Sequence, residues 1–329
     1  MAIAAKRIDM SIETNLRAAE TALARRAYRD AHGACMKVLQ LDPQNAQAFY
    51  LLGVLTADHD NHGKAIELFD RALVSDVSHG AAMVQKARSL IALNQRDQAL
   101  EVAHQAAQMP GLDAYALDTI GVVYSRAGRH EQAIALYESA LEKAPDRASY
   151  HYNYGAALQF MGRMDEARKA YRQAIACDPK DALAYAAIVT ITKQTEAQND
   201  IVSLETMFPD FAQDTSASLN IGHAIAKAYD DLGQADRAMD WLQKAKARKV
   251  QDLNYDPEFD AASFRQARQL TNLPMVTDPD PAGPIFITGM PRTGTTLVER
   301  SVSGHSRVMP AGELTDFGLL LKRAARAPG

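Results

Sequence analysis

The stretch GMPRTGTTLVER, residues 289–300, combines residue types that bind a phosphate or sulfate group. Gly289 and Gly294 lie five residues apart and bound a short loop that contains Arg292. Glycine lets an anion approach the backbone closely, and backbone N–H groups at the start of a following helix can converge on that anion. The stretch therefore predicts an anion-binding loop.

Such a loop needs a strand before it and a helix after it. Residues 285–288 (IFIT) form a short apolar run of β type, and the chain has helical character from Thr295 onward. In the GxxxxGK[ST] loop of nucleotide hydrolases, a lysine reaches the terminal phosphates. Here Thr295 occupies the lysine position and Arg292 carries the positive charge, which disfavours hydrolysis of ATP or GTP.

The segment PRTGTTL resembles the 5′-phosphosulfate loop of sulfotransferases that use 3′-phosphoadenosine-5′-phosphosulfate (PAPS). The resemblance is to the protein-tyrosine sulfotransferases and their bacterial relatives with N-terminal tetratricopeptide repeats. It implies that PAPS is the sulfuryl donor, that no metal is needed, and that Arg292 also neutralises charge on the transferred group. The residues that it implies for binding the 5′-phosphate and sulfate are Arg292, Thr293, Gly294, Thr295 and Thr296.

The next segment, GHSRVMPAGELTDF, also resembles this family. Glu313 falls where the tyrosine sulfotransferases place their general base, so the resemblance implies that Glu313 takes the proton of a hydroxyl acceptor such as a protein tyrosine. With Arg292, it completes the expected catalytic pair. We assign Glu299 and Arg300, one turn inside the helix, to an exposed charged face.

A period of 34 residues runs through the first 250 residues. Between the repeated small residues lie pairs of amphipathic helix patterns, which we expect to be separated by glycine-containing turns at Gly63, Gly128 and Gly162. The repeated positions are Ala19, Gly53, Ala87, Gly121 and Gly155 in one series and Ala31, Ala65, Ala99, Ala133 and Ala167 in the other.

The unit with Gly121, Tyr124, Gly128, Ala133, Tyr137, Ala140 and Pro145 resembles a tetratricopeptide repeat (TPR). The resemblance implies five units over residues 12–181, a degenerate sixth to about residue 215, and a last one at 219–252. It also implies a right-handed superhelix with a concave groove that binds a protein or peptide. The residues expected to face this groove are Tyr50, Val84, Asp118 and Tyr152.

These patterns predict a mainly α-helical chain in three parts. Residues 1–252 form the repeat domain, residues 253–283 a linker with a short helix that starts near Asp260, and residues 284–329 the beginning of an α/β, P-loop-like sulfotransferase domain. Because the last part is short for such a domain, we expect it to be truncated. The 329 residues alone are then expected to be inactive and to bind PAPS feebly.

Composition limits the partners. The net charge of −4 is spread along the chain, which argues against nucleic acid and against a membrane surface as partners. Two distant cysteines suit a reducing compartment, and no long apolar run occurs, so we expect a cytoplasmic protein. Two hypotheses remain: a PAPS-dependent sulfotransferase whose repeats present the acceptor, or a TPR scaffold for protein–protein interaction with a non-catalytic C-terminal remnant.

Overall fold

The computed structural model describes residues 2–253, 255–269, 283–290 and 293–312. The chain divides into two compact units, Met1–Asn254 and Tyr255–Gly329. Helices make up all of the regular structure in the described residues, and none of these helices is both long enough and apolar enough to cross a membrane. The first unit is a TPR-like helical solenoid.

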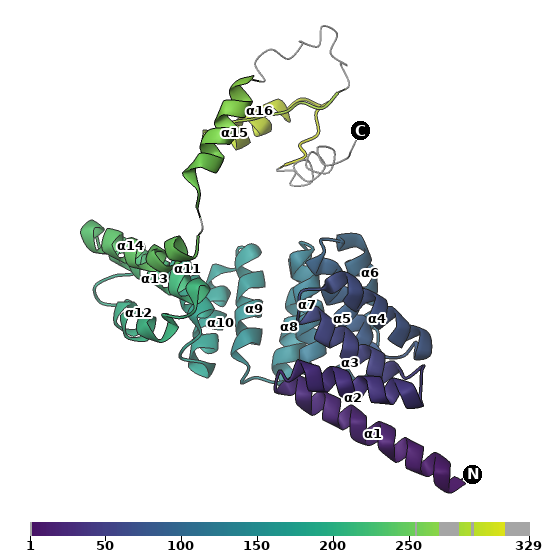
Figure 1. Ribbon diagram of the computed structural model, residues 1–329. Helices are drawn as coiled ribbons and strands as arrows, with labels where there is room; N and C mark the ends of the chain where they lie inside the picture. The colour runs from purple at the N-terminus through teal and green to yellow at the C-terminus, as the bar shows by residue number, and fades with distance from the viewer. Residues whose placement is uncertain (1, 254, 270–282, 291–292, 313–329) are drawn as a thin grey trace. The chain divides into compact units, whose positions relative to one another are not determined.

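Five helix pairs follow one another in chain order and each pair packs as an antiparallel hairpin (Figure 1). The pairs are α1 (Ala2–Ala24) with α2 (Tyr28–Leu41), α3 (Ala46–Ala57) with α4 (His62–Ser75), α5 (Gly80–Ala92) with α6 (Arg96–Ala107), α7 (Ala114–Arg126) with α8 (His130–Lys143), and α9 (Ala148–Phe160) with α10 (Met164–Cys177). The first helices of neighbouring pairs also contact each other, whereas no comparable contacts join the second helices of the described pairs. The first helices therefore line the inner side of the array.

Both repeated series of small residues are buried inside the pairs. All five alanines of the second series, from Ala31 to Ala167, have no exposed surface. In the first series, a Cβ atom added to Gly121 would lie 2.6 Å from Cε1 of Tyr137, and one added to Gly155 would lie 2.8 Å from Cε1 of Tyr171. Contacts under 3.0 Å are not tolerated, so these glycines are required by the ring that packs against them.

Each small residue of the first series is complemented in size by the residue 16 positions later. Each glycine of the series faces an aromatic ring on the second helix of its own pair, whereas each alanine is followed at the same distance by a small buried residue. The matched positions are Ala19 with Cys35, Gly53 with Phe69, Ala87 with Ala103, Gly121 with Tyr137, and Gly155 with Tyr171. We call these five pairs the size-matched pairs.

The turn inside each pair uses one residue with a positive φ angle, and this residue recurs at the 34-residue period. The expectation for Gly128 and Gly162 is met, with φ angles of 79° and 75°. The expectation for Gly63 is wrong, because Gly63 lies within α4 and the turn of that pair is made by Asp60, with a φ of 57°. Arg26 and Asn94 take the same conformation in their own turns, so glycine is not needed there.

The sixth unit departs from the pattern. After α11 (Ala182–Ile191) the chain runs without regular structure to Asp200, and only the short α12 (Ile201–Met207) and the 3₁₀ helix η1 (Phe208–Phe211) follow. Glu205 stands where the period would place an aromatic ring, and its carboxylate instead accepts a hydrogen bond from the Tyr229 hydroxyl at 2.6 Å. The α-helix ends at Met207, and Pro209, which has no backbone N–H, lies in the 3₁₀ helix that follows.

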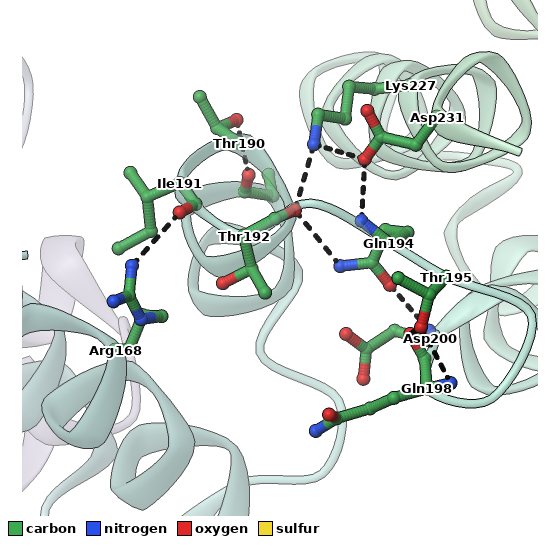
Figure 2. A network of polar contacts seen from close by, with 11 residues as sticks. Arg168, Thr190, Ile191, Thr192, Gln194, Thr195, Gln198, Asp200, Lys227 and Asp231 are labelled. Atoms are coloured by element: carbon green, nitrogen blue, oxygen red, sulfur yellow. Dashed lines mark hydrogen bonds and ion pairs between the residues drawn. The ribbon is translucent and has the colours of Figure 1, made fainter. Parts of the chain in front are cut away.

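Polar contacts hold the irregular loop of this unit in place, as Figure 2 shows. The side chain of Gln194 is 1% exposed, and its Oε1 accepts a hydrogen bond from the backbone N–H of Asp200 at 2.9 Å. Asp231 accepts a hydrogen bond from the backbone N–H of Gln194 at 2.7 Å and pairs with Lys227, whose Nζ also donates to the Thr192 carbonyl. The loop is therefore anchored to α13 (Thr215–Asp231), which pairs with α14 (Ala235–Asp252).

The second compact unit contains two described helices, α15 (Pro257–Gln269) and α16 (Thr295–Val302). The predicted helix near Asp260 corresponds to α15, and the predicted helix from Thr295 to α16. The predicted strand at residues 285–288 is wrong for the described chain, because these residues have no regular structure. A strand forms only beside another strand, and the described residues include no second strand with which this run could pair.

Candidate functional site

The predicted anion-binding loop ends at α16 with a sharp turn. Gly294 has a φ of 94°, a left-handed conformation that favours glycine. Thr293 stabilises the turn before it, because its Oγ1 donates a hydrogen bond to the Met290 carbonyl at 2.7 Å and its backbone N–H donates to the same carbonyl at 3.2 Å. The Thr293 hydroxyl is thus engaged with the loop itself, so binding of an anion by this oxygen would compete with that bond.

Gly289 is required for the close packing of the same loop. A Cβ atom added there would lie 2.6 Å from Oγ1 of Thr293 and 2.9 Å from Cγ2 of Thr295. Thr295 and Thr296 form the first turn of α16, where backbone N–H groups have no partner within the helix. The structure therefore brings together Thr293, Gly294, Thr295 and Thr296 as one turn, while Arg292 and Glu313 lie outside the described residues.

Glu299 has a contact that sequence reasoning missed. Its Oε1 accepts a hydrogen bond from the backbone N–H of Gly312 at 2.8 Å, so it joins α16 to the residue that precedes Glu313. The expected exposed charged face is found at Arg300, whereas Glu299 is only partly exposed. No sequence pattern signals this contact, because it joins positions 13 residues apart through a backbone group.

The inner side of the repeat array carries a second candidate site. At its N-terminal end, the Gln47 amide on α3 donates to Oε1 of Glu20 on α1 at 2.9 Å, and the Gln47 Oε1 lies 3.0 Å from Nε2 of His79 at the start of α5. The His79 ring in turn packs on the Tyr50 ring with centroids 5.0 Å apart. Polar and aromatic side chains thus connect three successive first helices.

The next two first helices continue this connection. The Tyr115 hydroxyl on α7 accepts hydrogen bonds from Nε2 of Gln85 at 2.8 Å and from NH1 of Arg88 at 3.4 Å, both on α5. The Tyr115 side chain is nevertheless 47% exposed, so it borders solvent on this face. We call the set the inner ladder; it comprises Glu20, Gln47, Tyr50, His79, Gln85, Arg88, Tyr115, Asp118 and Asn153.

Asp118 is the buried acid of the inner ladder. It is 8% exposed and accepts one hydrogen bond, from Nδ2 of Asn153 on α9 at 2.9 Å. Burial raises the pKa of the Asp118 carboxyl to about 6, although the Asn153 bond opposes this shift. Besides burial, the Asp118 carboxylate raises the pKa of Tyr137 on α8 and of Tyr150 on α9, which Arg126 and Arg147, respectively, lower. Among the described residues, however, no basic side chain forms an ion pair with Asp118.

The structure corrects part of the predicted groove. All four residues lie on first helices, but Val84 is 2% and Asp118 is 8% exposed, whereas Tyr50 and Tyr152 are partly exposed, so Val84 and Asp118 contribute little surface to a groove. The reason is that the next first helix packs over each position, α7 over α5 and α9 over α7. The period correctly predicted the matching positions but could not predict how closely neighbouring helices approach.

We expect Asp118→Asn to stabilise the fold at neutral pH and to have little effect near pH 4. Because the pKa in the folded state is about 6 and the ordinary value is 3.8, the folded protein holds this proton more tightly, and that contribution is lost as the pH rises through 6. A pKa difference of about two units corresponds to a gain of at most about 3 kcal/mol in the free energy of unfolding of Asp118→Asn. Urea unfolding of both proteins between pH 4 and 7.5 measures the difference.

The control for this experiment is Glu101→Gln, which removes an exposed carboxylate from α6 and should not change the pH dependence. A stability difference between Asp118→Asn and the unsubstituted protein that stays constant over this pH range would contradict the assignment of a raised pKa to Asp118.

A hollow of about 480 Å³ lies at the last helix pair. In it, the Lys244 ammonium lies 4.6 Å from the centre of the Trp241 ring, and the Arg237 guanidinium lies 5.4 Å from that of Tyr229. The residues that line it are Glu205, Tyr229, Arg237, Asp240, Trp241 and Lys244. Two acids face two bases, so charge alone selects no class of ligand.

Comparison with protein families agrees with the two-part organisation of the chain. Tetratricopeptide repeat profiles match residues 112–180 and 223–249, and the profile of anaphase-promoting complex, cyclosome, subunit 3 matches residues 24–106. A profile of the sulfotransferase family matches residues 284–328. The TPR character of the helical array is therefore supported at three places, whereas the sulfotransferase match is confined to one short segment.

Curated relatives match through part of the chain. An uncharacterized protein of Aquifex aeolicus is 27% identical over 188 residues, which cover 56% of this chain and 24% of the relative. The TPR repeat-containing thioredoxin TTL4 of Arabidopsis thaliana is 35% identical over 88 residues, 26% of this chain and 13% of the relative. The human NatB auxiliary subunit N-alpha-acetyltransferase 25 is 24% identical over 156 residues, which cover 47% of this chain and 16% of the relative. The chain spans about a quarter or less of these relatives.

Solved structures show the same fold. A structure from a study of PilF of Pseudomonas aeruginosa superimposes with a TM-score of 0.52 at 16% identity, covering 71% of this chain and 98% of that one. The Cut9–Hcn1 hetero-tetramer of APC/C gives a TM-score of 0.51 at 18% identity, covering 71% and 42%. At these identities the similarity establishes a TPR-like fold and nothing about the ligand.

Proposed function

We propose that the repeat array is a scaffold that binds a segment of a partner protein along the inner side of its first helices. The observation that carries this proposal is the inner ladder, which runs over five consecutive first helices and leaves ring edges and polar groups at the surface. Solenoids use such inner surfaces to bind extended ligands. The name of the human relative, an auxiliary subunit, describes a protein that works in an assembly, which is consistent with a scaffold.

Selection of peptides from a displayed random library on the full chain tests the scaffold function. We expect the selected peptides to lose at least tenfold in affinity with Tyr115→Ala, because this exposed ring is part of the inner ladder and aromatic side chains commonly dominate binding energy. Val74→Ala is the matched control, since Val74 is 89% exposed on the second helix α4. Fluorescence anisotropy measures the affinity of the selected peptides for each variant.

Two outcomes would contradict the scaffold proposal. One is a library from which no peptide is enriched on the full chain. The other is a set of selected peptides that bind Tyr115→Ala and the unsubstituted protein equally well, because such peptides would occupy another surface.

The second candidate is PAPS-dependent sulfuryl transfer to a hydroxyl acceptor, with Arg292 and the turn from Thr293 to Thr296 as donor site and Glu313 as general base. The sulfotransferase match at residues 284–328 supports it, as does the turn itself. In that turn, Gly289 allows close packing and Gly294 leads into the exposed first turn of α16. The chain's own groups would bind the phosphosulfate through backbone N–H donors and one guanidinium, and PAPS would supply the sulfuryl group.

A further inference from the structure

Asp118 is a feature that the packing of the array does not explain. An ionised carboxylate that is 92% buried and has one amide as its partner costs stability, whereas an apolar or amide side chain at this position would not. Ionisable groups held at such a cost are concentrated at sites where they bind or react. The question is therefore which group could pair with this carboxylate.

The position of Asp118 limits the possible partner. Oδ1 accepts the hydrogen bond from Asn153, while Oδ2 has no protein partner among the described residues. The Asp118 carboxyl belongs to the inner ladder, because Tyr115 precedes Asp118 on α7 and its partner Asn153 lies on the next first helix, α9. Because Asp118 is 8% exposed, the end of one long side chain could reach its carboxyl, whereas a folded surface could not.

The charge around the ladder favours a cation. The pKa of Tyr50 is raised to about 12, mainly by burial and in smaller part by Tyr115, Asp113 and Glu20. Two acids, Asp113 and Glu20, thus act on Tyr50, and Asp118 has no ion-pair partner among the described residues. The one arginine of the inner ladder, Arg88, contacts the Tyr115 hydroxyl at 3.4 Å. A lysine or arginine side chain complements Asp118, since its apolar stem can lie along Tyr115 while its charged end reaches the carboxylate.

We propose that Asp118 is a subsite for one basic side chain, lysine or arginine, of an extended peptide segment bound along the inner ladder. The inference rests on the proposed scaffold function and specifies the chemistry of its partner. Pairing with a cation would offset the desolvation of the carboxylate, because the two charges meet in a setting of low dielectric constant.

The test uses three pools of random decapeptides that differ only at one fixed central residue, which is lysine, glutamate or glutamine. The full chain is titrated with each pool and binding is followed by fluorescence anisotropy. We expect the lysine pool to bind at least tenfold more tightly than the glutamate pool. With Asp118→Asn this ratio should fall to threefold or less, whereas with Glu101→Gln, which removes one exposed carboxylate from α6, it should not change.

The outcomes separate this inference from the scaffold function. Binding of all three pools with equal affinity, or a lysine preference that persists in Asp118→Asn, would overturn the subsite and leave the scaffold intact. Absence of binding by every pool would remove both. Loss of folding does not confuse the result, because Asp118→Asn is expected to be more stable than the unsubstituted protein at neutral pH, and its helical circular dichroism spectrum provides the check.

Discussion

Replacing Gly121 with leucine is expected to lower the free energy of unfolding by about 3 kcal/mol, toward the upper end of the range for overpacked cores. The Cβ atom alone would lie 2.6 Å from Cε1 of Tyr137 and 3.0 Å from its Cδ1 and Cζ, and Tyr137 is 1% exposed, so the ring has no free space into which it can move. Chemical unfolding monitored by circular dichroism measures the change.

Gly33→Leu is the matched control for this experiment. Gly33 lies within α2, and a Cβ atom added there meets nothing within 4 Å. Leucine has the higher helix propensity, so this substitution should be neutral or should stabilise the protein by about 0.5–1 kcal/mol. Combining Gly121→Leu with Tyr137→Ala should recover part of the stability that Gly121→Leu loses, because the ring that clashes with leucine is then absent. Equal stability of Gly121→Leu and the unsubstituted protein would refute the assigned packing.

In a form of the protein that transfers a sulfuryl group from PAPS, Arg292→Ala is expected to abolish this transfer and to weaken PAPS binding. Glu313→Gln is expected to lower turnover by about 10²–10⁴-fold while PAPS affinity is nearly unchanged. A guanidinium bound to the phosphosulfate serves both binding and the transition state, whereas a general base serves only the chemical step. Turnover measured at saturating PAPS, together with titration of 3′-phosphoadenosine-5′-phosphate, separates the two roles.

The control for these two substitutions is Arg300→Ala, which removes an exposed positive charge from α16. It should change neither turnover nor PAPS affinity by more than about twofold, as is usual for surface substitutions. Unchanged turnover in Glu313→Gln would show that another group acts as the base. Unchanged PAPS affinity in Arg292→Ala would contradict its role in the donor site.

The repeat period predicted the helix pairs and their buried alanines because each unit must bury the same face. Ala31, Ala65, Ala99, Ala133 and Ala167 are all fully buried, and Gly121 and Gly155 meet rings at the expected helix contacts. The period did not predict the turn residue of the second unit, because Asp60 adopts a positive φ without being a glycine. The residue type is therefore a weaker guide to the turn than the position in the repeat, because aspartate and asparagine can adopt the positive φ that glycine usually supplies.

The candidate sites were predicted less completely than the fold. The loop and α16 follow from glycine spacing, but the contact of Glu299 with the Gly312 backbone depends on a chain reversal that no local pattern encodes. The burial of Asp118 depends on the distance between two neighbouring first helices, which the 34-residue period does not specify. Both features arise from tertiary packing, so residue spacing alone could not predict them.

The size-matched pairs have a consequence for how such an array can evolve. Both members of each pair lie in one unit, for example Gly53 and Phe69 on α3 and α4. A gene duplication or deletion of 34 codons therefore carries the large ring and the glycine that accommodates it together. Whole units can be gained, lost or exchanged without creating a steric mismatch, whereas a recombination junction between the two helices of one unit would bring a ring against an alanine or leave a glycine without its ring.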